Sequence, residues 1–121
     1  MDRRSIGQAA EAAAASHLLE RGWRIVVRNY RRRLGELDLV ARQDRVLAVI
    51  EVRTRASGAY GGAAASVTAR KQRRIQRATE QLLQSRRDLR GLLVRFDVIV
   101  VYEPTTSRPR VEWIEHAFAA C

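Results

Sequence analysis

The chain has 121 residues, of which 46% are hydrophobic and 30% are charged. This length suits a single domain over residues 1–121, with one core and no room for a second domain. The longest apolar stretches are broken by charge well short of the ~20 residues that a membrane span needs. The alanine-rich start lacks the leucine-rich core of a signal peptide, and the one cysteine, Cys121, excludes an intrachain disulfide. We therefore expect a cytoplasmic protein with no membrane partner.

The charge is strongly basic, with a formal net charge of +10 and a pI near 11.4. Such an excess on a small chain implies an anionic partner, most simply a nucleic-acid backbone. Of the 23 lysines and arginines only Lys71 is a lysine, which leaves 22 arginines. We interpret this as a bias toward arginine, so that an arginine in an unusual place is unsurprising and a retained lysine is informative.

The first predicted element is a helix over residues 5–21, because the segment is rich in alanine and Gly22 follows it. Glu11 lies one turn after Gly7 and one turn before Ala15, so it falls on a face of small residues. From the residues alone, a surface glutamate is the simpler explanation.

A first strand is predicted over residues 23–30, which are β-branched and aromatic. Three consecutive arginines follow, and they predict a basic turn made of Arg31, Arg32 and Arg33. Such a run either contacts phosphates or forms a solvated surface, and the sequence leaves both interpretations open.

Residues 35–55 contain two apolar runs that carry acids and are joined by a polar turn at residues 43–45, a pattern typical of a β-hairpin. Because side chains alternate along a strand, Glu36 and Asp38 share one face of the first run, while Glu51 and Arg53 share one face of the second. Asp38 and Glu51 are therefore expected to converge.

Two explanations remain for acids inside runs that otherwise read as sheet core. Burying a carboxylate costs free energy, and a shared divalent cation held by oxygen ligands would offset that cost. The alternative is a partly exposed hairpin whose acids form ion pairs with Arg42 and Arg55.

The segment from residue 56 to residue 66 has three glycines, one tyrosine and no charge, which is a loop composition. Its position directly after Glu51 and Arg53 suggests a flap over the site. Tyr60 is expected either to stack on an unpaired base or to pack locally.

A second helix is predicted over residues 67–87, with Thr68 as its N-cap and an apolar stripe that begins at Ile75. Lys71 lies one turn before Ile75, so we expect its side chain to point toward the proposed site. The remaining faces of these turns form a basic ridge, which suits contact with a nucleic-acid backbone or merely raises solubility. The ridge residues are Arg70, Arg73, Arg74 and Arg77.

Residues 95–102 form a nearly continuous apolar run, which indicates a buried central strand. Asp97 inside this run requires a partner, for which Arg95 is a candidate, and we expect a structural role. A short last strand is predicted over residues 110–115. The order of elements predicts an α/β fold with a helix on each face of the sheet.

The segments GELDLVA, VIEVRTR, VTARKQRRI and RFDVIVV, spread over nearly the whole chain, resemble the YraN-like family of small bacterial proteins. That family is placed in the restriction-endonuclease-like PD-(D/E)xK superfamily, beside archaeal Holliday-junction resolvases and RecB-type nuclease domains. The resemblance implies a single nuclease-like domain with an αβββαβ core, a mixed central sheet and helices on both faces.

The resemblance also implies roles for individual residues. The two acids of the superfamily pattern fall on Asp38 and Glu51, and a further acid from the first helix falls on Glu11. Gln72 matches a glutamine of RecB-like sites. The basic position falls on Arg53, where the pattern has lysine, so this chain departs from the pattern there.

We therefore expect a metal-dependent endonuclease that hydrolyses phosphodiester bonds of DNA, branched or junction DNA included. Mg²⁺ or Mn²⁺ would be held by Glu11, Asp38 and Glu51, and the catalytic set would add Arg53, Lys71 and Gln72. The alternative is a catalytically impaired protein that keeps the nuclease fold and binds nucleic acid. A third class is an interaction subunit for an acidic protein or ribosomal RNA, and a homodimer stays open.

Overall fold

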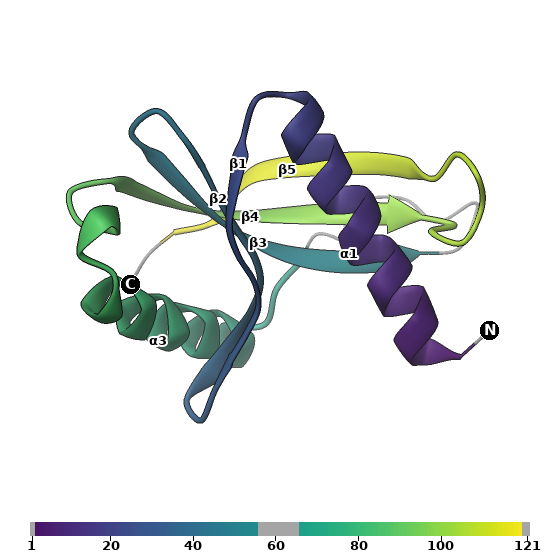
Figure 1. The fold of residues 1–121 in the computed structure, drawn as a ribbon. Coiled ribbons are helices and arrows are strands. Elements are labelled where there is room, and N and C mark those ends of the chain that lie inside the picture. The colour runs from purple at the N-terminus through teal and green to yellow at the C-terminus, as the bar shows by residue number, and fades with distance from the viewer. Residues whose placement is uncertain (1, 56–65, 120–121) are drawn as a thin grey trace.

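A computed structural model describes residues 2–55 and 66–119. Helices cover both faces of a five-stranded sheet of order β1-β2-β3-β4-β5 (Figure 1), in which β3 and β4 are parallel and the other neighbours are antiparallel. The elements are α1 (Arg3–Glu20), β1 (Arg24–Arg32), β2 (Gly35–Gln43), β3 (Val46–Arg55), α3 (Ala69–Ser85), the short 3₁₀ helix η1 (Arg87–Leu89), β4 (Leu93–Tyr102) and β5 (Arg110–Phe118). The predicted fold class, an α/β domain with a mixed sheet and a helix on each face, is confirmed.

Each helix covers its own face of the sheet because successive strand residues point to opposite sides. On β3, Ala48 and Ile50 pack in the core beneath α1, whereas Leu47 and Val49 pack in the core beneath α3. The alanine-rich face of α1 lets this helix approach the sheet closely. None of the helices in the described ranges is long and apolar enough to cross a bilayer.

The basic turn predicted at Arg31, Arg32 and Arg33 is wrong in its extent. Arg31 and Arg32 continue β1, and the turn consists of Arg33 and Leu34 alone. Arg31 is the register partner of Glu36 and forms an ion pair with it, a cross-strand pairing of opposite charges that favours the strand. Residues 56–65 of the predicted loop, which include Tyr60, lie outside the described residues.

Asp97 has the structural role predicted for it. Its carboxylate is 0% exposed and accepts hydrogen bonds from the Arg95 guanidinium at 2.9 Å, the Trp113 indole at 2.8 Å and the His116 backbone N–H at 3.1 Å. The pairing of β4 with β5 is irregular at this point. A buried carboxylate that has donors on every side therefore holds the last strand against β4.

Gly35, the first residue of β2, packs directly on the backbone of α3. A methyl group at this position would collide with the carbonyl oxygen of Arg74 and would lie 2.9 Å from the carbonyl carbon. These are backbone atoms of a capped helix, so they have little freedom to move aside. The β1–β2 hairpin therefore lies directly against the backbone of α3 at Gly35.

We expect Gly35→Ala to lower the free energy of unfolding by about 1–3 kcal/mol through overpacking. Gly7→Ala is a matched control, because a methyl group on Gly7 meets nothing within 4 Å and should stabilise α1 by roughly 0.5–1 kcal/mol. Urea unfolding of both variants measures the difference. Equal stabilities would contradict the close contact at Gly35.

Candidate functional site

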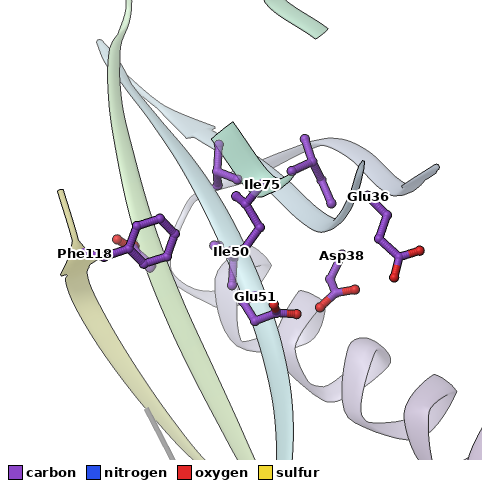
Figure 2. Close-up of a pocket in the computed structure, with 9 residues that line it drawn as sticks. Glu36, Asp38, Ile50, Glu51, Ile75 and Phe118 are labelled. Atoms are coloured by element: carbon purple, nitrogen blue, oxygen red, sulfur yellow. The ribbon is translucent and has the colours of Figure 1, made fainter. Parts of the chain in front are cut away.

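The site lies where β2 separates from β3. The ladder between the two strands runs from the pair Gln43–Val46 to the pair Leu39–Ile50. Beyond it, the backbone N–H of Val52 donates a 2.9 Å hydrogen bond to Asp38 Oδ2. The Asp38 side chain therefore replaces the backbone carbonyl that would accept this hydrogen bond in a regular ladder, and β2 and β3 diverge from this point. Figure 2 shows Asp38 and Glu51 with their carboxylates facing one another across the gap.

A small pocket occupies this gap. It has a volume of about 10 Å³, which is roughly the space that one water-sized particle needs. Three of its lining acids are Glu36, Asp38 and Glu51 (Figure 2). The remaining lining residues are Leu37, Val49, Ile50, Ile75, Asp97 and Phe118. The acids therefore share a small space with apolar side chains, where charges interact more strongly than they do in water.

Glu51 is the most perturbed acid of the site. Burial raises the pKa of Glu51 to about 8, assisted by a hydrogen bond with Asp38 and by the negative charge of Asp38, while Lys71 and Arg53 oppose the rise. The Lys71 ammonium lies 3.5 Å from Glu51 Oε2, at the start of α3, where Thr68 caps the helix through the Lys71 N–H. The inward orientation predicted for Lys71 is confirmed.

Glu11 reaches the site from α1. Burial raises the pKa of Glu11, and the charge of Asp38 raises it further, while a hydrogen bond with Asn29 lowers it. Within residues 2–55 and 66–119, however, no three or more Asp, Glu, His or Cys side chains form a group that could hold a metal ion. The structure thus brings Asp38 and Glu51 together and places Glu11 beside Asp38 without completing a three-residue cluster.

The donor set nevertheless fits a hard divalent cation. Glu51 Oε2 is buried and, within the described part of the chain, accepts no hydrogen bond. The Lys71 ammonium at 3.5 Å is its nearest described cation, and a proton or a bound metal ion would complete its environment, since carboxylate oxygens are ligands that Mg²⁺ prefers. Asp38 Oδ2 faces the same gap and accepts a hydrogen bond from the Val52 N–H.

The alternative of ion pairs with Arg42 and Arg55 is wrong. The guanidinium of Arg42 donates to the backbone carbonyls of Asp44 at 3.1 Å and Asp88 at 3.4 Å. That of Arg55 donates to the carbonyl of Thr54 at 2.7 Å. Both arginines therefore satisfy backbone groups elsewhere, and the cations that act on Glu51 are Lys71 and Arg53.

Arg53 and Gln72 differ in their relation to the acids. Arg53 lies two residues after Glu51 on β3 and is half-buried, and its charge lowers the pKa of Glu51. Gln72 donates its side-chain amide to the Val67 carbonyl at 2.8 Å, which stabilises the start of α3. Its predicted catalytic role stays a prediction.

Arginine-rich hollows flank the acids on both sides of the sheet. On the α3 side, the ridge arginines predicted from the sequence line one hollow together with the β1–β2 turn: Arg33, Leu34, Arg70, Arg73, Arg74 and Arg77. On the α1 side, a second hollow is lined by Arg3, Arg4, Gly7, Gln8, Glu11, Asn29 and Arg31. Of the arginines predicted to contact nucleic acid, Arg31 thus lines the second hollow and the α3 ridge lines the first together with Arg33, whereas Arg32 lines neither.

Sequence reasoning missed Asn29. It has φ of 51°, a left-handed conformation inside β1 that asparagine tolerates better than most residues. An asparagine, which is rare in strands, inside a predicted strand was the available signal. The backbone distortion lies beside Glu11, with which Asn29 forms a hydrogen bond that lowers the pKa of that acid.

The pH dependence of stability reports on Glu51. Because its pKa is about 8 in the folded chain and ordinarily 4.5, the folded chain keeps a proton that the unfolded chain loses, so the stability contributed by Glu51 is greatest below pH 4.5 and falls as pH rises toward 8. In metal-free buffer, the melting temperature of wild type should fall between pH 5 and pH 8 relative to that of Glu51→Gln. Circular dichroism measures both curves, and parallel curves would contradict the buried, protonated glutamate.

Comparison with known proteins places the chain in a family. The model of the Uncharacterised protein family UPF0102 matches residues 10–101. A UPF0102 protein of Moorella thermoacetica is 46% identical over 98% of each chain. Another, of Saccharophagus degradans, is 42% identical over 93% of this chain and 91% of its own. The matched residues include all of β2, β3 and α3, and the chain therefore belongs to the UPF0102 family, the YraN-like family that its motifs resemble.

Proposed function

We propose that this protein is a metal-dependent endonuclease that hydrolyses phosphodiester bonds of DNA. The observation that carries the proposal is the half-buried pair Asp38 and Glu51, in which one buried carboxylate oxygen has no hydrogen-bond donor among the described residues. The arrangement of the two acids and Arg53 on adjacent strands agrees with the resemblance to the PD-(D/E)xK superfamily. Asp38 and Glu51 would hold Mg²⁺ or Mn²⁺, and Glu11 would complete the ligand set.

The chain's own residues prepare the site for phosphate chemistry. A bound divalent ion would polarise a phosphoryl oxygen and lower the pKa of a water molecule. Lys71 balances the charge of Glu51 at 3.5 Å and is a donor that can reach a phosphoryl oxygen. Arg53 can stabilise the charge that develops on phosphate, but it does not act as a base because guanidinium keeps its proton. The flanking arginines would hold the DNA strand in place.

A second candidate is a nucleic-acid-binding protein with little or no cleavage. Two observations favour it: arginine stands at position 53, where the superfamily pattern has lysine, and Lys71 already occupies the free side of Glu51. The arginine-rich hollows would bind phosphates equally well in a non-cleaving protein and in a nuclease. The two candidates therefore diverge at Arg53.

Cleavage of a panel of labelled duplex, single-stranded, flap and four-way-junction DNAs in Mn²⁺, Mg²⁺ or EDTA tests the proposal. We expect metal-dependent cleavage by wild type and none by Asp38→Asn or Glu51→Gln. If Arg53 stabilises charge, Arg53→Lys should change the rate less than about tenfold, whereas Arg53→Ala should remove activity. Glu80→Gln, an exposed acid on α3, is the matched control.

Cleavage by Arg53→Lys but not by wild type would establish the binding protein as the correct alternative. The absence of cleavage by both, together with an unchanged melting temperature in millimolar Mn²⁺, would contradict a metal site. Mn²⁺ should otherwise raise the melting temperature of wild type, because apposed carboxylates repel until a cation binds, and Asp38→Asn should abolish the rise.

DNA binding should depend steeply on salt. If about five phosphates are neutralised by the arginines of the α3 side, log affinity should fall against log salt with a slope near −4 to −5, and the double substitution of Arg73 and Arg74 by alanine should reduce this slope by about 2. Replacing Arg24 and Arg45, which are exposed at the opposite end of the β1–β2 hairpin, removes the same charge and should change the slope less. Binding that ignores salt would favour a protein partner.

A further inference from the structure

Leu34 stands out among the apolar residues of the surface. In residues 2–55 and 66–119, three large hydrophobic side chains are exposed: Leu19 at 51%, Leu34 at 46% and Leu93 at 68%. Single exposed leucines are ordinary and require no explanation. Leu34, however, is one of two residues in the β1–β2 turn and lines the arginine hollow, so its surroundings are cationic, not neutral.

The arginines around Leu34 are available to a ligand. Five of them line the hollow with it, and none of these five forms an ion pair in the part of the chain that the structure describes. No acid lines the hollow. Unpaired guanidinium groups crowded together are complementary to closely spaced phosphates, which they recognise in a planar, bidentate way. The positive charge of these arginines therefore favours a nucleic-acid backbone as the ligand of the hollow.

The turn that carries Leu34 is held rigidly. Arg32 pairs with Gly35 across its base, Tyr30 and Leu37 are buried in the core under α3, and Gly35 abuts the backbone of Arg74. Figure 1 shows the β1–β2 turn projecting beyond the sheet beside one end of α3. A rigid projection loses little conformational entropy when it inserts into a partner.

We propose that Leu34 is a wedge that inserts at an interrupted base stack of DNA while the surrounding arginines hold the phosphates on either side. Insertion of an apolar side chain between base pairs costs the free energy of unstacking them. At a nick or flap the stacking is already interrupted, so this cost is smaller. The protein would thus select duplexes with a break in their stacking. This inference rests on the proposed function and adds to it the structural class of the substrate.

The position of Leu34 also sets the distance between the proposed wedge and the acids of the site. Leu34 in the turn and Asp38 on β2 are four residues apart in the chain, which corresponds to about 13 Å when the backbone is fully extended. This distance spans roughly four base pairs at 3.4 Å each. The wedge and the site therefore act on one short stretch of DNA, with the wedge offset from the bond that the acids face.

Binding in EDTA tests the wedge without any contribution from cleavage. Fluorescence anisotropy compares a duplex with a flap of equal length, and 2-aminopurine at the branch reports unstacking. Wild type should bind the flap about tenfold more tightly than the duplex and should brighten the 2-aminopurine. Leu34→Ala should lose about fivefold or more of that preference while its duplex affinity and salt slope stay unchanged.

Two control variants separate the wedge from general effects. Leu34→Met conserves volume and should keep the preference. Leu93→Ala removes an exposed leucine from the start of β4, at the opposite end of the β2 strand from the turn, and should behave as wild type. Leu34 is exposed at 46%, so Leu34→Ala should melt at the wild-type temperature.

The outcomes distinguish failure of the wedge from failure of the proposed function. Salt-dependent binding by wild type without a preference for the flap, or a preference that survives Leu34→Ala, overturns the wedge and leaves the nuclease proposal standing. A wild-type protein that binds none of the DNAs overturns both. Loss of preference and of 2-aminopurine brightening in Leu34→Ala, with both controls unaffected, supports the wedge.

Discussion

The geometry of the site depends on one hydrogen bond, from the Val52 N–H to the carboxylate of Asp38. It satisfies a backbone donor that the β2–β3 ladder leaves unpaired after Leu39 and Ile50, and a buried N–H without an acceptor would cost roughly 1–3 kcal/mol. Because a side chain supplies the acceptor, β2 is free to turn away from β3. The gap that results gives Glu51 its buried position.

The charge balance of the gap follows from this geometry. Burial raises the pKa of Glu51 to about 8, and the hydrogen bond with Asp38 and the negative charge of Asp38 add to this rise. The Lys71 ammonium, at the capped start of α3, lies 3.5 Å from Glu51 Oε2 and opposes the rise of this pKa. A lysine suits this place because its ammonium is a compact charge on a flexible stem and can withdraw when another cation binds. In a chain that otherwise uses arginine, its retention agrees with that requirement.

Much of the fold could be predicted because its causes are local: the two-residue alternation of β2 and β3, the apolar stripe of α3 and the cap at Thr68. The convergence of Asp38 and Glu51 follows from the same alternation. The close approach of Gly35 to Arg74 and the meeting of Arg33 with the α3 ridge depend on how distant elements pack, and no short pattern encodes them. Glu11 was assigned to the site from family resemblance alone, since glutamates are mostly exposed and a place on a face of small residues does not by itself indicate a site.

Asp97 and Glu51 are both withdrawn from solvent, but their surroundings differ. The surroundings of Asp97 suit a structural role, and those of Glu51 suit a role in binding or catalysis. Asp97 is fully enclosed and receives hydrogen bonds from Arg95, Trp113 and the His116 backbone, so its environment is complete and stabilises the strand pair around it. Glu51 is buried with an oxygen that accepts no hydrogen bond among the described residues. Proteins rarely leave such a group unsatisfied without a functional reason. The Lys71 ammonium lies 3.5 Å from this oxygen, and a ligand that donates a hydrogen bond or coordinates at the gap would complete the environment of Glu51.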